Sequence, residues 1–207
     1  MSEPRQETGI DLTRERFPEG IHICMIFDRD EDRQKIVSEY LTAGLRQGEL
    51  VRYAVDVTTP EQVRSWLLEL GVELPPEGGP FSVFKAENFY CPNGRFEPRE
   101  MIDGMLPRFE KFREAGYSGV RSCGEMTWAF KGIPGSDRLL EYEALLNTVA
   151  GTFPHTGMCL YDARLFDGAT LFKVLQVHPW MIVRGKIIQN PYFISPQEFI
   201  KESKSKQ

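Results

Sequence analysis

The apolar residues of this chain gather in short runs that predict the strands of a buried sheet. The near-continuous run at residues 21–27 is typical of a strand covered on both faces. Similar runs at residues 50–55, 81–84, 119–123 and 156–161 predict four further strands. These strands indicate a sheet at the centre of the fold.

Between the runs, apolar residues recur every three or four positions, which is the spacing of a helix with one buried face. This spacing and the capping residues predict helices at residues 31–47, 60–70, 98–115 and 136–150, and between Asp167 and Pro179. Gly48 stands at the C-terminal cap position of the first helix. Pro107 is expected to kink the third helix.

The order of these elements predicts the fold class. Strands and helices alternate with short connections, which is typical of parallel strands joined by right-handed crossovers. Residues 180–183 and 186–188 flank Arg184-Gly185 and indicate a hairpin or a pair of edge strands. The prediction is α/β: a three-layer, mostly parallel sheet flanked by helices, with a C-terminal hairpin or edge strands.

The same pattern predicts one domain without an interdomain linker. Residues 1–19 carry charge and proline without periodicity and are predicted to be a flexible leader. Residues 20–195 hold all of the predicted strands and are expected to form a single α/β domain. Residues 196–207 are predicted to form a short C-terminal helix, which a capping box at Ser195 opens, and a basic tail.

Charge and hydropathy narrow the classes of partner. The net charge of −5 argues against nucleic acid as a direct partner, because such binding needs clustered Lys and Arg. The basic cluster Lys201, Lys204 and Lys206 is better explained as a solvated tail. Residues 1–20 lack the apolar run of a signal peptide, and no stretch reaches the ~18 apolar residues of a membrane span. We therefore expect a cytoplasmic protein without membrane contact, whose cysteines are reduced.

The loop after the first predicted strand argues against a functional ATPase. A phosphate-binding loop would place Gly-x-x-x-x-Gly-Lys-Ser/Thr there. Residues 27–32 read Phe-Asp-Arg-Asp-Glu-Asp instead, and these acids would repel a triphosphate. An acid follows each of the five predicted strands. These acids could bind a cation at the carboxyl edge of the sheet or simply cap the next helix: Asp28, Asp56, Glu87, Glu125 and Asp162.

Cysteine and histidine positions offer a weak case for a metal. His22 and Cys24 lie two apart on one strand and so share a face, and Cys123 and Cys159 lie near the ends of two further strands. A metal site of these four residues is an alternative to plain core packing, but no CxxC pair supports it. We expect no cofactor.

Catalysis has no positive signal in the sequence. No serine or cysteine has a recognisable base beside it, and no Gly-x-Ser-x-Gly elbow is present. His155 follows Pro154 in a predicted loop and is expected to be solvated. His178 precedes Pro179 at a predicted helix end, where an imidazolium would favour the helix dipole. The sequence therefore predicts no catalytic residue.

Aromatic residues near the strand ends could line an apolar pocket that also holds a few polar groups. Core packing is the competing explanation for each of them: Tyr90, Trp128, Tyr161, Trp180 and Tyr192.

Short motifs across residues 20–195 resemble a known family in the same order. They are His22-Ile23-Cys24, Gly44-Leu45 to Gly48-Glu49, Gly124-Glu125-Met126-Thr127-Trp128, Leu140-Glu141-Tyr142-Glu143, Cys159-Leu160-Tyr161-Asp162, His178-Pro179 and Asn190-Pro191-Tyr192. Residues 40–55 are similar to the first helix and second strand of KaiC/RecA-type ATPases. The whole set is closer to the methanogen/methylotroph, DcmR-type sensory (MEDS) domain.

This resemblance implies a RecA-like fold without the Walker A loop, and a role in sensing small molecules such as hydrocarbon derivatives or C1 compounds. A separate signalling protein is expected to carry the output, because the sequence holds no output module of the kind fused to such domains. The hypothesised ligand contacts are His22, Glu125, Trp128, Glu141, Tyr161 and His178. If so, Glu125→Ala should weaken ligand binding without unfolding the domain.

Two alternatives remain open at the level of sequence. The first is an enzyme that uses the acidic rim and His178 for metal-assisted or acid–base chemistry, which a stoichiometric metal would favour. The second is a pure protein-interaction module that self-associates through a RecA-like subunit surface. A concentration-dependent homo-oligomer that ignores small molecules would favour the second.

Overall fold

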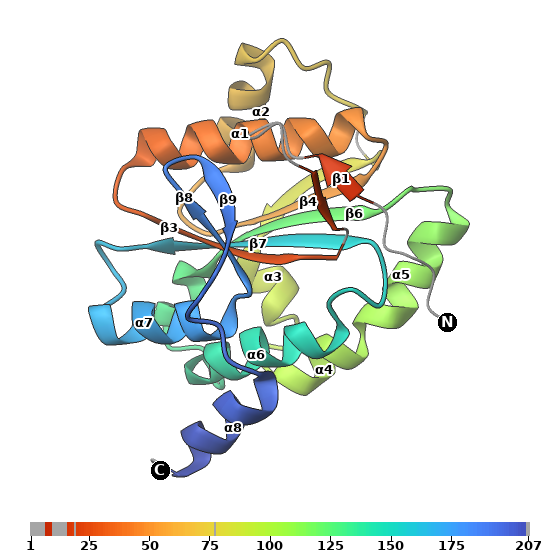
Figure 1. Ribbon diagram of the computed structural model, residues 1–207. Helices are drawn as coiled ribbons and strands as arrows, with labels where there is room; N and C mark the ends of the chain where they lie inside the picture. Colours follow the sequence, from red (N-terminus) through yellow and green to blue (C-terminus); the bar gives the residue numbers. More distant parts are fainter. Residues whose placement is uncertain (1–6, 10–15, 19, 77, 206–207) are drawn as a thin grey trace.

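The computed structural model describes residues 7–9, 16–18, 20–76 and 78–205 (Figure 1). Its main sheet has seven strands in the order β5 (Phe81–Lys85), β4 (Leu50–Val55), β6 (Val120–Glu125), β7 (His155–Asp162), β3 (His22–Phe27), β8 (Trp180–Val183) and β9 (Lys186–Gln189). Neighbouring strands are parallel except β8 and β9. The predicted sheet with a C-terminal hairpin is confirmed.

Helices cover both faces of this sheet, which confirms the predicted three layers (Figure 1). One face carries α1 (Asp30–Arg46) and α2 (Pro60–Glu69), and we call it the α1 face. The other, the α6 face, carries α3 (Ala86–Tyr90), α4 (Pro98–Asp103), α5 (Met105–Glu114), α6 (Leu139–Val149) and α7 (Gly168–Val177). The last helix, α8 (Pro196–Ser205), packs Phe199 against α6 and α7. None of the described helices is long and apolar enough to span a membrane.

Strand alternation decides which side chains meet on each face. Cys123 packs in one apolar cluster with residues of α1, whereas Cys24 and Cys159 pack in a second cluster with residues of α6. Cys24 and Cys159 are also partners in the register of β3 and β7. Because side chains alternate along each strand, two residues one position apart face opposite sides of the sheet and belong to different sites.

The sequence signals for turns and helix ends hold. Thr59 and Gln62 form the predicted capping box, and Asp167 accepts a hydrogen bond from the Thr170 N–H. Gly48 has φ +71°, as its predicted cap position requires. Arg184 and Gly185 also have positive φ, which suits a two-residue hairpin turn.

Two helix predictions need correction, and one short helix was missed. The helix expected at 98–115 breaks at Gly104 and not at Pro107. Pro107 lies in the first turn of α5, where a missing N–H costs no hydrogen bond, and Arg108 donates to the Gly104 carbonyl at 2.7 Å. Ser136 opens a short 3-10 turn, and α6 begins after it. The five-residue helix α3 was not predicted, because it is too short to show a period.

The chain ends also differ in part from the predictions. Residues 7–9 and 16–18 of the predicted leader form β1 (Glu7–Gly9) and β2 (Arg16–Pro18), which pair antiparallel. Three-residue strands are too short for alternation to reveal them. The rest of the predicted leader up to residue 19, and residues 206–207 of the predicted tail, lie outside the described residues.

Candidate functional site

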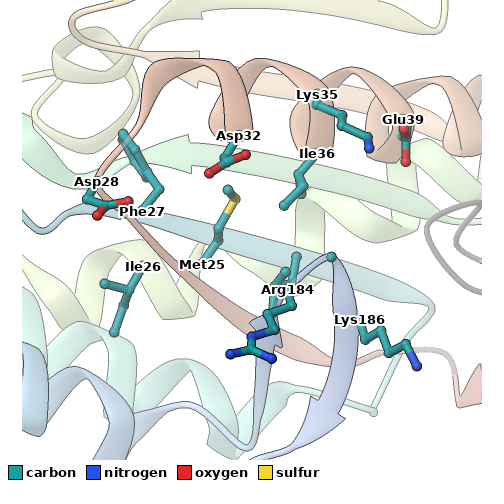
Figure 2. Close-up of a pocket in the computed structure, with 12 residues that line it drawn as sticks. Met25, Ile26, Phe27, Asp28, Asp32, Lys35, Ile36, Glu39, Arg184 and Lys186 are labelled. Carbon is teal, nitrogen blue, oxygen red and sulfur yellow. The ribbon is translucent and has the colours of Figure 1, made fainter.

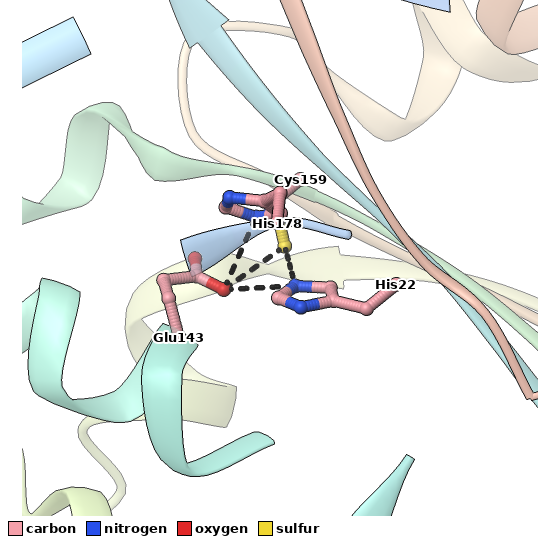
Figure 3. A group of neighbouring side chains, drawn as sticks. All are labelled: His22, Glu143, Cys159 and His178. Carbon is pink, nitrogen blue, oxygen red and sulfur yellow. Dashed lines mark hydrogen bonds and ion pairs between the residues drawn. The ribbon is translucent and has the colours of Figure 1, made fainter. Parts of the chain in front are cut away.

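A buried carboxylate on α6, Glu143, lies at the centre of a polar cluster (Figure 3). His22 begins β3, Cys159 lies within β7, and His178 follows the last residue of α7. The Glu143 Oε2 atom lies 3.0 Å from His22 Nε2 and 3.5 Å from His178 Nε2. The Cys159 Sγ atom lies 3.5 Å from both His22 Nε2 and Glu143 Oε2. Four residues from four elements thus converge inside the protein.

Outer contacts orient the two imidazoles. The Asn147 amide donates to the backbone carbonyls of Glu143 and Val177, so its Oδ1 atom faces His22 Nδ1 as an acceptor at 3.1 Å. His178 Nδ1 lies 2.7 Å from the Val174 carbonyl, which can only accept. Both rings therefore carry a proton on Nδ1 and turn Nε2 towards the carboxylate.

The protonation of the cluster follows from burial and from its charges. Burial alone would raise the pKa of Glu143, but the hydrogen bonds and charges of the His178 and His22 rings, which act when Nε2 carries a proton, outweigh it and hold this pKa well below its usual value. Burial lowers the pKa of His178 and raises the pKa of the Cys159 thiol, which the Glu143 charge raises further. Tyr161, whose pKa burial also raises, donates to Glu143 Oε1 at 2.7 Å. The cluster combines a charged carboxylate with nitrogen and sulfur groups of the kind that bind transition metals.

The metal alternative drawn from sequence names two residues of this cluster and two that lie outside it. His22 and Cys159 belong to the cluster. Cys123 does not, because it lies on the α1 face. Cys24 shares the α6 face but is not among the converging groups, and burial raises the pKa of its thiol to about 12. Glu143 and His178 complete the set instead.

An apolar pocket of about 200 Å³ lies beside the cluster on the α6 face, and Cys159 lines it too. Its aromatic walls are Phe84, Phe89, Tyr90, Phe109, Phe112 and Tyr142. Polar groups are few, and two of them bond to each other: Ser122 Oγ lies 2.7 Å from His155 Nε2. His155 is the first residue of β7, and it is buried and not solvated as expected. Burial lowers the pKa of its imidazole to about 3.

A larger groove of about 510 Å³ lies between α1 and the β8–β9 turn, at the carboxyl end of β3 (Figure 2). Its charged lining residues are Asp28, Asp32, Glu39, Lys35, Arg184 and Lys186, so the two signs balance. This groove occupies the place at which the phosphate-binding motif was sought in the sequence. Its mixed charges give no concentrated attraction for an anion or a cation.

Glu125 has a different environment from the one proposed for a ligand contact. Its Oε2 atom accepts the N–H groups of Asp56, Val57 and Thr58 at 2.6, 2.7 and 3.1 Å. Its Oε1 atom accepts from Tyr53 at 2.9 Å and Arg33 at 3.2 Å, and also from the Thr58 hydroxyl. All of these donors lie at the α1 face or in the loop after β4. This side chain therefore holds the β4 loop to the end of β6.

The six hypothesised ligand contacts do not form one site. His22, Tyr161 and His178 converge on Glu143. Glu125 lies across the sheet from them. Trp128 is fully buried and stacks on Tyr90, and its Nε1 has no hydrogen-bond partner among the described residues. Glu141 is partly exposed and pairs with Arg138 at 2.9 Å.

The acids of the predicted rim are mostly paired with bases. Asp56 lies 2.5 Å from Lys131 Nζ, and Asp162 lies 2.7 Å from Arg164 Nη2. Glu87 also faces Lys131, at 3.4 Å. Among the residues that the structure describes, these acids do not converge as the Glu143 cluster does.

Glu143 and Asn147 were not predicted from the sequence, although Glu143 lies within the motif Leu140-Glu141-Tyr142-Glu143. One signal was present: the two residues are four apart, so they share a helix face. Glu141, two positions earlier, was chosen because nothing in the sequence shows which face of the helix meets the sheet.

Most of this chain matches a known protein family. Residues 21–179 match the model described as the MEthanogen/methylotroph, DcmR Sensory domain. A transcriptional repressor, DcmR of Methylorubrum extorquens (strain DSM 6343 / CIP 106787 / DM4), is 27% identical over 158 residues. The match covers 76% of this chain and 57% of the repressor, so it spans little more than half of that relative.

Solved structures share the fold at low identity. A KaiC-like protein from the archaeon Pyrococcus horikoshii OT3 superposes with a TM-score of 0.53 at 13% identity, covering 86% of this chain and 80% of its own. The flagellar accessory protein FlaH from Methanocaldococcus jannaschii gives 0.54 at 12% identity, covering 88% and 84%. The RecA/KaiC-like fold expected from the sequence is confirmed.

Proposed function

Because this chain belongs to the MEDS family of sensory domains, we propose that it is a regulatory domain that senses a small organic molecule in the apolar pocket of the α6 face. The observation that supports this most directly is the pocket itself. It is concave, mostly apolar and aromatic, and has a few polar groups at fixed positions. These are the general properties of small-molecule sites.

The size of the pocket limits the ligand. A dry engineered cavity of ~150 Å³ holds benzene, so a pocket of about 200 Å³ suits a molecule only slightly larger. The Ser122–His155 pair offers one hydrogen-bonding position, and Arg52 and Arg108 each bring a cation to the lining. The proposed ligand class is a small hydrocarbon derivative with an apolar body and one polar group.

The proposed route to an output is a population shift. A ligand that packs between β6, β7 and α5 favours the conformation in which α5 is held against the sheet. A separate partner protein would read the surface of that conformation. The related repressor DcmR supports a regulatory output for such a domain.

The test is a thermal-shift screen of the purified chain against small hydrocarbon derivatives, with Gly157→Ala and Gly168→Ala as matched variants. A Cβ at Gly157 would lie 3.4 Å from His155 and 3.5 Å from Ser122, so the added methyl fills the pocket without a clash. A Cβ at Gly168 meets nothing within 4 Å. Both substitutions are glycine to alanine at ordinary backbone angles.

A ligand at a hundredfold excess over its Kd should stabilise the wild type and Gly168→Ala by about 2.7 kcal/mol. In Gly157→Ala the affinity should fall at least tenfold, because the methyl occupies ligand space. A ligand that stabilises all three proteins equally would place its site elsewhere. A screen with no response from any such compound would refute the ligand class.

A further inference from the structure

We propose that His22, Glu143, Cys159 and His178 bind one divalent transition metal ion of the zinc type. The proposal concerns the buried cluster on the α6 face and does not rest on the proposed function, because a closed metal site can serve stability alone.

The ligand atoms are already spaced for a tetrahedral ion. Tetrahedral zinc takes nitrogen and oxygen ligands at ~2.0–2.2 Å and sulfur at ~2.3 Å, which sets the ligand–ligand separations at about 3.3 to 3.6 Å. Four separations in the cluster are 3.0, 3.5, 3.5 and 3.5 Å. All four ligand atoms lie within 4.8 Å of one another. The cluster therefore needs only small side-chain adjustments to surround an ion.

The His178 imidazole also favours a bound ion. His178 is fully buried, and its Nε2 has no hydrogen-bond partner among the described residues. Its Nδ1 proton is fixed by the Val174 carbonyl, and that of His22 by Asn147, so in the neutral rings both Nε2 lone pairs face the Glu143 carboxylate. The negative charge of the carboxylate repels each of these lone pairs. A cation between them converts this repulsion into three bonds.

An outer layer of hydrogen bonds surrounds the four ligand residues. Metal-bound imidazoles usually donate their second N–H to a carbonyl or carboxylate, and bound carboxylates accept a further hydrogen bond. Here Asn147 and the Val174 carbonyl serve the imidazoles, and Tyr161 serves Glu143. Each of these contacts leaves the inward ligand atom free to bind.

Ligand chemistry selects the class of ion. Two imidazoles and a thiol exclude calcium and magnesium, which take oxygen ligands. With the Cys159 thiol deprotonated on binding, one carboxylate and one thiolate neutralise a divalent ion, so that the buried site carries no net charge. Since none of the four side chains is more than 6% exposed, the ion would enter as the protein folds.

The experiment starts from the full chain unfolded in denaturant with chelator and reductant, then refolded with Zn²⁺, with Co²⁺ or without metal. We expect one tightly bound equivalent of metal, a higher Tm with Zn²⁺, and with Co²⁺ the absorption of a tetrahedral ion with a thiolate-to-metal band. Refolded wild type that takes up neither ion stoichiometrically would overturn the proposal without recourse to any variant.

Cys159→Ser and Cys24→Ser form the matched pair of variants. Both cysteines are buried, and they face each other in the register of β3 and β7, but only Cys159 belongs to the cluster. Cys159→Ser should lose the thiolate band and weaken Zn²⁺ binding at least tenfold, whereas Cys24→Ser should keep both. Loss of the band in Cys24→Ser alone, or in neither variant, would place the metal elsewhere and refute the assignment.

Discussion

Two deeply buried carboxylates, Glu125 and Glu143, lie on opposite faces of one sheet, and their surroundings differ in kind. Glu125 is met by donors that are fixed as donors: three backbone N–H groups, two hydroxyls and a guanidinium. Glu143 has one hydroxyl donor, from Tyr161, while its second oxygen faces two imidazole nitrogens and a thiol. Equal burial therefore does not mean an equal role.

The two carboxylates differ in the capacity for binding that their partners leave. Every lone-pair direction of Glu125 is used to hold the β4 loop, so this residue can offer nothing to a ligand without releasing that loop. Glu143 faces groups that change from donor to acceptor when they lose a proton. Such a group can exchange a proton for a metal ion, which Glu125 and its donors cannot do.

The largest expected effect comes from Glu125→Gln. Whichever way the amide turns, its NH2 group faces hydrogen-bond donors, and Arg33 loses its buried counter-charge. The free energy of unfolding should fall by about 3 to 5 kcal/mol. Urea denaturation at neutral pH measures this. A loss below about 1 kcal/mol would show that the network around Glu125 is not rigid, and would restore this residue as a candidate ligand contact.

The next effect is a pH dependence of stability that arises on the α6 face. The pKa of His155 is about 3 in the folded chain and near its usual value of 6.5 when unfolded. As the pH falls from 6.5 to 4.5, only the unfolded state gains this proton, so the wild type should lose about 1.4 kcal/mol per pH unit through His155. His155→Gln, which does not titrate, should lack this part of the slope in urea denaturation. Equal slopes would show that His155 takes up its proton in the folded state.

A pair of tyrosines tests the donors directly. Tyr161→Phe removes the one hydroxyl donor of Glu143 and should cost about 1 to 3 kcal/mol. Tyr53→Phe leaves Glu125 with its remaining donors and should cost about 1 kcal/mol or less. Thermal and urea denaturation of both variants give the difference. A larger loss in Tyr53→Phe would reverse the proposed contrast.

The smallest effect is expected from Glu143→Gln in metal-free protein. The amide oxygen can still accept from Tyr161, and the NH2 group can donate to the Nε2 lone pairs of His22 and His178. Stability should stay within about 1 kcal/mol of the wild type in the presence of chelator. A loss above about 3 kcal/mol would mean that one imidazole is protonated and paired with the carboxylate.

Much of the fold could be predicted because local patterns report local structure. The run at residues 21–27 and the capping box at Thr59 place β3 and α2 close to their observed bounds. Pro107 misled because the effect of a proline depends on where its helix begins, and Gly104 decides that here. Short elements such as β1 and α3 have too few residues to show a period.

The sequence by itself determined the α/β alternation, the acidic loop that replaces a phosphate-binding loop, and the shared face of His22 and Cys24. Only the tertiary structure decided that Cys159 joins that face and Cys123 the other, and that α6 turns Glu143 and not Glu141 inward. The physical reason is that side-chain periodicity fixes directions only within one element. Which elements become neighbours depends on how the crossovers order the strands, and that order is a property of the whole packed chain.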